Sequence, residues 1–139
     1  MERTFVDTNV LVYADDRSAG KKGERARTLL HELMTSRAGV ISIQVLQEYF
    51  AVATRKLGVS AEVARRKIEL LASLDVIRPE VADVLAAIDL TRLRSISFWN
   101  ALIVRSAENG GCTVLLSEDL NDGEVISGVR VKNPFKAET

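Results

Sequence analysis

The sequence contains a single cysteine, Cys112, among its 139 residues. An intrachain disulfide is therefore excluded, and the cysteine usage fits a reducing compartment. The opening residues MERTFVDTNV carry charges of both signs and no long apolar run, unlike a secretion signal. No other stretch approaches the roughly 20 apolar residues of a membrane span. We therefore expect a cytoplasmic protein with no membrane contact.

The sequence also lacks a net charge, because 19 Lys and Arg residues balance 19 Asp and Glu residues. A nucleic-acid-binding surface would have to be local, since affinity for phosphates comes from clustered cations. The candidate cations are Lys21, Lys22, Arg25, Arg27, Arg55, Lys56, Arg65, Arg66 and Lys67. Taken singly, each is more simply explained by a solvated helix face. Histidine is almost absent too: His31 is alone, which excludes catalysis by a pair of histidines.

The rest of the composition is that of one folded domain over residues 1–139. Hydrophobic residues make up 47% and charged residues 27%, as in ordinary globular proteins. We find no internal repeat, linker or low-complexity segment. Trp99 could stack on a base, but beside Phe98 it is expected in the core, and Cys112 is expected to be packed.

Short apolar segments alternate with helical patterns along the chain. Strands are predicted at 3–6, 40–43, 75–78, 113–116 and 129–131. Helices are predicted at 9–16 (capped by Thr8 or Asn9), 24–37, 44–57 and 98–109, with two more beginning near Ser60 and Val81. The last of these has one apolar face, expected to pack on the core, formed by Val81, Val84, Leu85 and Ile88. This alternation predicts an α/β layer fold with a parallel sheet.

Polar side chains follow the ends of the predicted strands. Asp7 follows the first strand, and Glu48 lies one turn into the helix after the second. Asn100 lies in the first turn of the helix before the fourth strand, and Ser117 and Asp119 directly follow that strand. Because sites in such sheets lie beyond the carboxyl ends of the strands, we expect these side chains at one edge.

A group of carboxylates at one edge favours a bound cation, because the anions otherwise repel one another. Oxygen ligands select Mg²⁺ or Mn²⁺ over zinc, and such an ion can activate water and stabilise a phosphodiester. Each residue has a simpler explanation when taken alone. Asp7 can cap a helix, Glu48 can be a solvated helix residue, and Asn100 can complete a weak capping box with Ser97. Taken together at one edge, they favour a site.

Four segments resemble the PIN-domain family and, more narrowly, the VapC-type ribonuclease toxins of bacterial toxin–antitoxin pairs. They are FVDTNVLVYA, SIQVLQEYF, SISFWNALIVRSA and LLSEDLNDGEVISGVRVKNPF, which occur in family order and span essentially the whole chain. The resemblance implies a three-layer α/β/α sandwich with a short, mainly parallel central sheet, forming a single PIN-like ribonuclease domain over residues 1–139. It also implies an Mg²⁺ (or Mn²⁺) cofactor, an RNA substrate, a cognate antitoxin that covers the acidic site, and a homodimer.

The resemblance also assigns roles to particular residues. It implies four catalytic and metal-binding positions, which here are Asp7, Glu48, Asn100 and Asp119. Supporting positions are Thr8, Ser117 and, with a peripheral role, Asp122. The sequence departs from the family at Asn100, where relatives carry Asp in a motif like SFWDAL.

The amide at position 100 can offer an oxygen to a metal ion, but it brings no anion and cannot accept a proton. Losing one anion could cost about tenfold or more in metal affinity, since each ~1.4 kcal/mol is tenfold. Asn100 is either an engineered change that suppresses toxicity or a natural residue of an attenuated enzyme. Both explanations stay open. We predict a metal-dependent endoribonuclease that is attenuated or inactive in this form.

Two other classes of function compete with this prediction. A haloacid-dehalogenase-like phosphatase also begins with an Asp after its first strand, but it needs a second Asp where this sequence has Asn9. A non-catalytic PIN-like module that binds RNA or an antitoxin is favoured by Asn100. It is opposed by Asp7, Glu48 and Asp119, because a lost site has little reason to keep three anions together.

Overall fold

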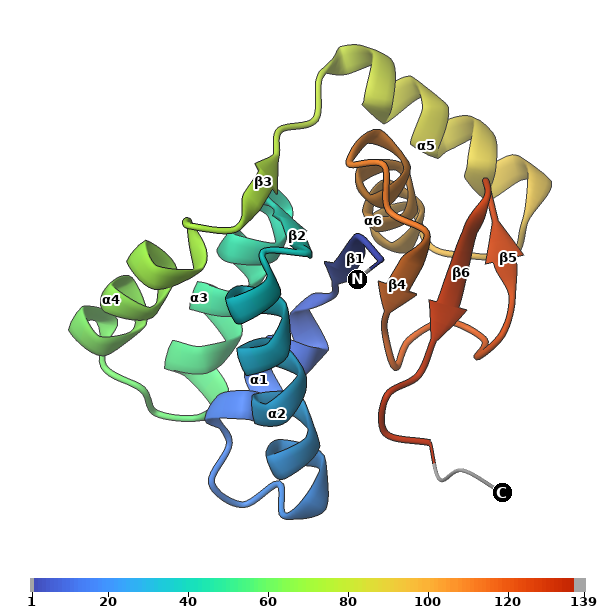
Figure 1. The fold of residues 1–139 in the computed structure, drawn as a ribbon. Coiled ribbons are helices and arrows are strands. Elements are labelled where there is room, and N and C mark those ends of the chain that lie inside the picture. Colours follow the sequence, from blue (N-terminus) through green and yellow to red (C-terminus); the bar gives the residue numbers. More distant parts are fainter. Residues whose placement is uncertain (1, 137–139) are drawn as a thin grey trace.

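The computed structural model describes residues 2–136, which form six helices and one six-stranded sheet (Figure 1). The strands are β1 (Thr4–Val6), β2 (Gly39–Ser42), β3 (Asp75–Ile77), β4 (Val114–Leu116), β5 (Val125–Ile126) and β6 (Val129–Lys132). The helices are α1 (Thr8–Asp15), α2 (Lys21–Ser36), α3 (Ile43–Lys56), α4 (Ala61–Leu71), α5 (Val81–Leu93) and α6 (Phe98–Asn109). The predicted α/β class is confirmed.

The sheet is mainly parallel, as predicted. Its strand order is β3-β2-β1-β4-β6-β5, so β1 lies near the centre and pairs in parallel with both β2 and β4. Strands β3 and β6 extend the parallel arrangement on either side. Among the described strands only the two-residue β5 runs antiparallel, as a hairpin with β6. This short strand was not predicted, because two residues are too few to show an alternating pattern.

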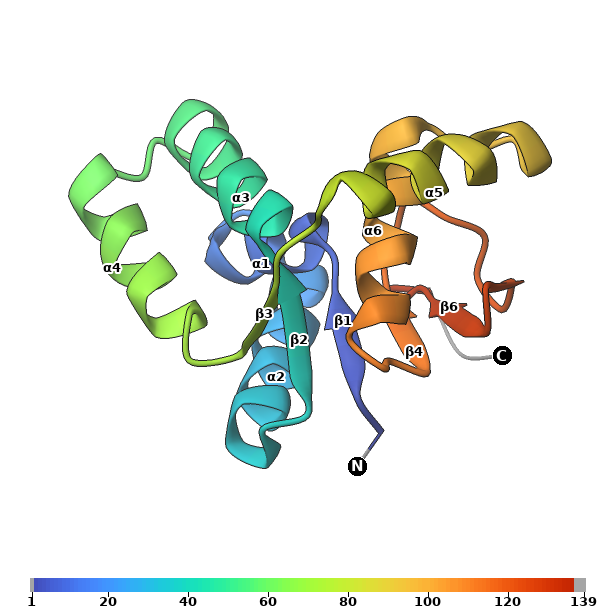
Figure 2. The same cartoon turned by 90° about the horizontal axis from the view of Figure 1, so that it is seen from above.

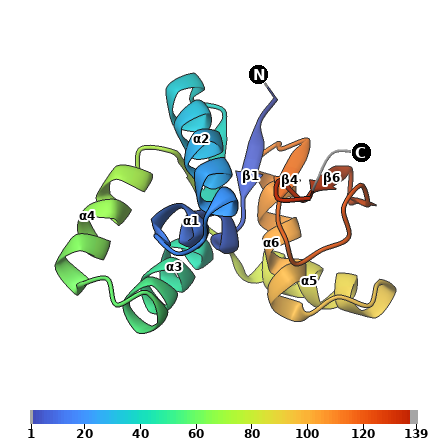
Figure 3. The same cartoon turned by 90° about the horizontal axis from the view of Figure 1, so that it is seen from below.

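Helices cover both faces of the central strands. Successive residues of a strand point to opposite faces of the sheet. The neighbours of Gly39 and of Val40 in β2 therefore show which helix covers each face. A Cβ added at Gly39 would lie 3.3 Å from Leu33 Cβ of α2, whereas one added at Gly110, just after α6, would lie 2.9 Å from Val40 Cγ1. Figures 2 and 3 show α2 and the α5–α6 pair on opposite sides of these strands. The arrangement is the three-layer sandwich that the family resemblance implies.

The core lies between these layers and holds the three central strands in place. Phe5 of β1, Ile41 of β2 and Leu115 of β4 are all fully buried, as is Tyr49 of α3. Cys112 is buried in the same cluster, as predicted. Strands buried on both faces need continuous apolar sequence, which explains the runs that made them predictable. No helix within residues 2–136 is long and apolar enough to cross a membrane.

Helix α5 differs from the prediction, because its large aliphatic face is exposed. Val81 is 75% exposed and Leu85 is 57% exposed, and Val84 and Ile88 are exposed beside them. The opposite side packs on α6, where Ala87 is buried. There the carboxylate of Asp83 accepts from Arg105 Nε at 2.9 Å and from Asn109 Nδ2 at 2.7 Å. A small side chain and a buried carboxylate therefore make the contact that the aliphatic residues were expected to make.

Two smaller predictions were also wrong. Trp99 is 61% exposed rather than in the core, and packs edge-to-face on Phe98 with ring centroids 5.1 Å apart. Helix α2 begins at Lys21, three residues before the predicted start at residue 24, because Gly20 supplies the turn with a φ of 60° just before it.

Candidate functional site

Three helices begin at the carboxyl edge of the sheet. Helix α1 follows the end of β1 and α3 follows the end of β2, and these strands are parallel. Helix α6 leads back to the start of β4, so its first turn lies at the same edge. Gln44 Nε2 of α3 donates to the carbonyl oxygen of Trp99 at 3.3 Å, which joins the first turns of α3 and α6. The topology therefore gathers the predicted residues on one side of the molecule.

Asp7 is the buried centre of this group, with 4% of its surface exposed. It caps α1, where Thr8 or Asn9 was expected to do so, because its Oδ1 accepts from the Thr8 backbone N–H at 2.7 Å. Its Oδ2 accepts from Ser117 Oγ at 2.7 Å. Two of the three predicted supporting residues thus contact Asp7, Thr8 through its backbone and Ser117 through its hydroxyl.

Burial raises the pKa of Asp7 from 3.8 to about 6. The negative charges of Asp119 and Glu48 raise this pKa further, whereas the hydrogen bonds from Ser117 and Thr8 lower it. Burial is the largest cause, because a carboxylate removed from water loses solvation that two neutral donors do not fully replace. The protein therefore keeps an anion where it is costly, which is typical of functional sites.

Asn9 links the carboxylates of Asp7 and Asp119. Its Nδ2 donates to Asp119 Oδ2 at 3.2 Å and lies 3.5 Å from Asp7 Oδ2. Its Oδ1 accepts from the Glu118 backbone N–H at 3.4 Å. The Asp119 backbone N–H in turn donates to Ser117 Oγ at 3.1 Å. Asn9 was not predicted as a site residue, although its place directly after Asp7 and Thr8, in the first turn of α1, puts it beside the site.

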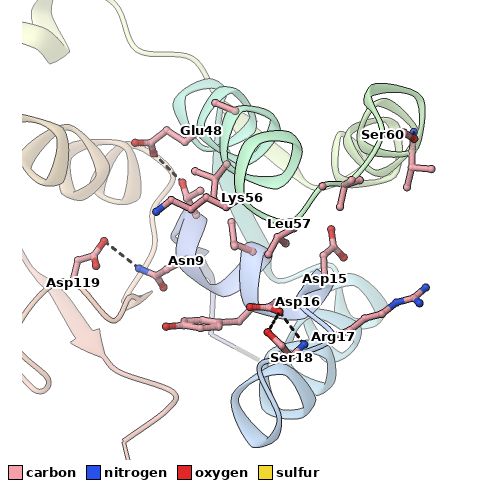
Figure 4. Close-up of a pocket in the computed structure, with 18 residues that line it drawn as sticks. Asn9, Asp15, Asp16, Arg17, Ser18, Glu48, Lys56, Leu57, Ser60 and Asp119 are labelled. Atoms are coloured by element: carbon pink, nitrogen blue, oxygen red, sulfur yellow. Dashed lines mark hydrogen bonds between the residues drawn. The ribbon is translucent and has the colours of Figure 1, made fainter.

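Glu48 joins the group through Thr8. It is half-buried on α3, and its Oε1 accepts from Thr8 Oγ1 at 2.9 Å. Thr8 therefore contacts Asp7 with its backbone and Glu48 with its side chain. Figure 4 shows Glu48, Asn9 and Asp119 at one end of an open pocket. Hydrogen bonds thus connect Asp7, Glu48 and Asp119 to one another through short polar side chains.

Asn100 lies at the same edge, half-buried in the first turn of α6. Its backbone N–H donates to Ser97 Oγ at 3.1 Å, so Ser97 is the cap of this helix. The cap uses the backbone of residue 100, which any amino acid except proline supplies. Capping therefore gives no reason for an amide side chain at this position.

Asp122 is engaged elsewhere. Its Oδ1 accepts from the Asn133 backbone N–H at 2.8 Å, and its Oδ2 lies 3.8 Å from Lys136 Nζ. Asp122 therefore anchors the segment after β6. Glu118 also turns away from Asp7: it accepts from Tyr13 Oη and from Lys22 Nζ, each at 2.8 Å.

An open groove with a volume of about 1220 Å³ leads away from Glu48 and Asp119. It runs between α1, α3 and the start of α4, and its lining combines carboxylates, which include Asp15 and Asp16, with apolar side chains such as Val52 and Val63. Lys67 Nζ of α4 lies 3.2 Å from Asp15 Oδ1 of α1, an ion pair that ties the two walls together. The groove is large enough to hold part of a polymer beside the carboxylates.

The donor set suits a hard divalent cation. The carboxylates of Glu48 and Asp119 and the hydroxyls of Thr8 and Ser117 lie around Asp7, and oxygen atoms of these kinds are the ligands that Mg²⁺ and Mn²⁺ prefer. In the part of the chain that the structure describes, no three Asp, Glu, His or Cys side chains stand close enough together to hold an ion. Glu48 is half-buried and Asp119 is exposed, so a change of rotamer is open to both.

The sequence matches the PIN domain over residues 4–122, and the chain therefore belongs to the PIN-domain family. PIN domains are typically metal-dependent. A comparison with curated protein sequences finds no significant match.

Several solved structures share the fold. VapC20 of Mycobacterium tuberculosis, a Sarcin-Ricin loop cleaving toxin, has a TM-score of 0.65 at 22% identity, covering 84% of this chain and 91% of its own. A toxin–antitoxin complex from Klebsiella pneumoniae has a TM-score of 0.69 at 18% identity, covering 96% and 99%. DNA-bound VapBC from Salmonella typhimurium has a TM-score of 0.68 at 19% identity, covering 96% and 99%. At these identities the similarity shows the fold.

The pKa of Asp7 predicts how stability depends on pH. Its folded pKa of about 6 exceeds the ordinary 3.8, so the folded state binds the proton more tightly. The Asp7 contribution to stability is therefore full below about pH 4 and is lost as pH rises through about 6. In EDTA, Asp7→Asn should raise the free energy of unfolding at pH 7.5, by at most about 3 kcal/mol, with no gain near pH 3.5.

Urea denaturation at the two pH values measures this difference. Asp122→Asn is the matched control, because Asp122 is exposed and pairs with Lys136, and it should give no gain at pH 7.5. A lower free energy of unfolding for Asp7→Asn at pH 7.5 would contradict this prediction, because it would show that the ionised Asp7 side chain stabilises the fold.

Proposed function

We propose that the chain is a Mg²⁺- or Mn²⁺-dependent endoribonuclease of the VapC type, the toxin component of a toxin–antitoxin pair. The observation that carries the proposal is the hydrogen-bonded set of Glu48, Thr8, Asp7, Ser117 and Asp119 at the carboxyl edge of a PIN-domain sheet. A PIN domain whose structural neighbours are VapC toxins suggests a ribonuclease. The acidic edge next to an open groove supports the same function.

The roles follow from how firmly each side chain is held. Asp7 is buried and fixed by two hydrogen bonds, so it supplies the immobile anion of the site. Glu48 and Asp119 would complete the oxygen ligands from α3 and from the segment after β4, and Asn100 would offer a neutral oxygen from the first turn of α6. A divalent ion held there supplies an activated water and stabilises charge on the phosphodiester. Glu48 or Asp119, the two less buried carboxylates, would orient the attacking water or accept its proton.

Antitoxin binding is part of the proposal. Structural neighbours include toxin–antitoxin complexes, which suggests an antitoxin partner. The groove beside Glu48 and Asp119 is open and partly apolar, so a segment of a partner protein could lie in it and cover the acidic edge. Such a segment would exclude RNA while it is bound.

A non-catalytic module that binds RNA or the antitoxin is the alternative. Asn100 favours it, because one anion of the proposed site is replaced by an amide. The buried Asp7 opposes it, since a module without metal chemistry gains nothing from an anion whose pKa is raised to about 6. Metal-dependent cleavage separates the two functions.

Restoring the anion at position 100 should raise RNA cleavage. Asn100→Asp is expected to increase Mn²⁺-dependent cleavage of a mixed RNA pool by at least about tenfold, because each ~1.4 kcal/mol of metal or transition-state stabilisation is tenfold. Gln47→Glu adds the same charge at an exposed position next to Glu48 and should leave the rate unchanged. The assay follows product formation on denaturing gels with Mn²⁺ and with EDTA.

Asp7→Ala in the Asn100→Asp background should abolish this cleavage while circular dichroism remains that of the folded chain. Equal rates for the starting chain and Asn100→Asp would remove residue 100 from the mechanism. Cleavage that persists in EDTA or with Asp7→Ala would refute the metal-dependent site altogether.

We also propose that the chain forms a homodimer through the exposed face of α5. Val81, Val84, Leu85 and Ile88 form one aliphatic stripe along the helix, without a charged residue within it. A monomer rarely leaves such a stripe in water, and a stripe on one helix can pair with its own copy about a two-fold axis. The stripe lies on the opposite side of α5 from the α6 contact, so pairing leaves the fold unchanged.

Size-exclusion chromatography with light scattering tests the dimer. Leu85→Glu should convert the dimer to a monomer, because it places a charge at the centre of the stripe. Leu70→Glu is the matched control: Leu70 is 63% exposed on α4, so the same substitution there should leave the mass unchanged. A monomeric starting chain, or a dimer that survives Leu85→Glu, would contradict the assignment.

A further inference from the structure

Lys56 lies near the end of the groove that holds Glu48 and Asp119, which we call the acidic end. It is the last residue of α3 and lines the groove together with Thr8, Asn9, Glu48 and Asp119. Figure 4 shows its side chain extending from α3 toward the space between Glu48 and Asp119. The preceding residue, Arg55, is exposed and does not line the groove. Two neighbouring cations at the end of one helix therefore differ in what they face.

The ammonium group of Lys56 is not committed to an ion pair. Among the salt bridges within residues 2–136, none involves Lys56. By contrast, Lys22 Nζ lies 2.8 Å from Glu118 Oε2 and Lys67 Nζ lies 3.2 Å from Asp15 Oδ1. Lys67 thus ties α4 to α1 and Lys22 pairs with Glu118 outside the groove, whereas Lys56 has no carboxylate partner among the described residues.

Arg17 is the other cation that lines the groove, but it lies at a different place. Figure 4 shows Arg17 beside Asp16 and Ser18, with its side chain directed away from Glu48 and Asp119. Lys56 is thus the groove cation that faces the acidic end.

We infer that Lys56 binds a phosphate of the RNA substrate next to the bond that is cut. The inference rests on the proposed ribonuclease function and adds a substrate-binding residue to it. An RNA strand brings its anionic backbone to an edge that already carries Asp7, Glu48 and Asp119, and its approach needs a positive charge beside the site. A lysine supplies a compact charge on a flexible stem that can meet a phosphate without fixed geometry.

Two other roles for Lys56 are separable from this one. Cations in the last turn of a helix stabilise it through the helix dipole, and Arg55 shares that position with Lys56. Lys56 could alternatively serve only to offset the repulsion among the carboxylates. The first role predicts equal effects for Arg55 and Lys56. The second predicts a change in cation affinity instead of a change in RNA affinity.

The test measures binding of a short fluorescent single-stranded RNA of mixed sequence by anisotropy, with Ca²⁺ in place of Mn²⁺ to prevent cleavage. Lys56→Gln should weaken binding about fivefold at low salt and lower the slope of log K against log salt by about 0.7, as expected for one lost phosphate contact. Lys56→Arg should retain most of the affinity, and Arg55→Gln should stay within about twofold. Mn²⁺ affinity, measured by calorimetry, should not fall in Lys56→Gln.

An unchanged RNA affinity and salt slope in Lys56→Gln would overturn the inference, as would an equal loss in Arg55→Gln. If Asn100→Asp still cuts RNA with Mn²⁺, either result would exclude the role of Lys56 but leave the proposed ribonuclease function standing. Absence of any RNA binding or cleavage by the starting chain and by Asn100→Asp would overturn the proposed function and the inference together.

Discussion

The hydrogen bonds to the buried carboxylate of Asp7 fix the geometry of the whole acidic edge. Ser117 donates to one oxygen at 2.7 Å from the end of β4, and the Thr8 backbone donates to the other at 2.7 Å from the start of α1. Two neighbouring parallel strands and a helix are thereby tied at one point. Each of these two residues also contacts another acidic residue of the site. Ser117 Oγ accepts from the Asp119 backbone N–H, and Thr8 Oγ1 donates to Glu48 Oε1.

The fold and the centre of this site could be predicted from the sequence, because both depend on local patterns. Strands buried on both faces read as apolar runs, and parallel strands bring their carboxyl ends to one edge whatever the details. That reasoning placed Asp7, Ser117 and Asp119 correctly near one another. It could not find the link through Asn9, since a side-chain amide after Asp-Thr carries no signature of which loop it contacts.

Helix α5 shows the limit of periodicity. The spacing of Val81, Val84, Leu85 and Ile88 identifies an apolar face, but a pattern does not tell whether the chain's own core or another molecule covers it. The contact with α6 depends on Asp83 and its partners Arg105 and Asn109, which are distant in sequence. Asp122 shows the same limit in a loop, because its bond to Asn133 depends on how the end of the chain returns to the sheet.

The proposed function requires that the acidic edge binds a divalent ion, and a Mn²⁺ titration followed in the amide NMR spectrum measures this binding. Paramagnetic broadening falls steeply with distance from the ion, so it reports position without any need for activity. We expect the amides of Thr8, Glu48, Asn100 and Asp119 to broaden first and together, and Asp7→Asn to prevent this broadening. Broadening that begins at Asp15 and Asp16, or that is unaffected by Asp7→Asn, would show that the ion does not bind at Asp7.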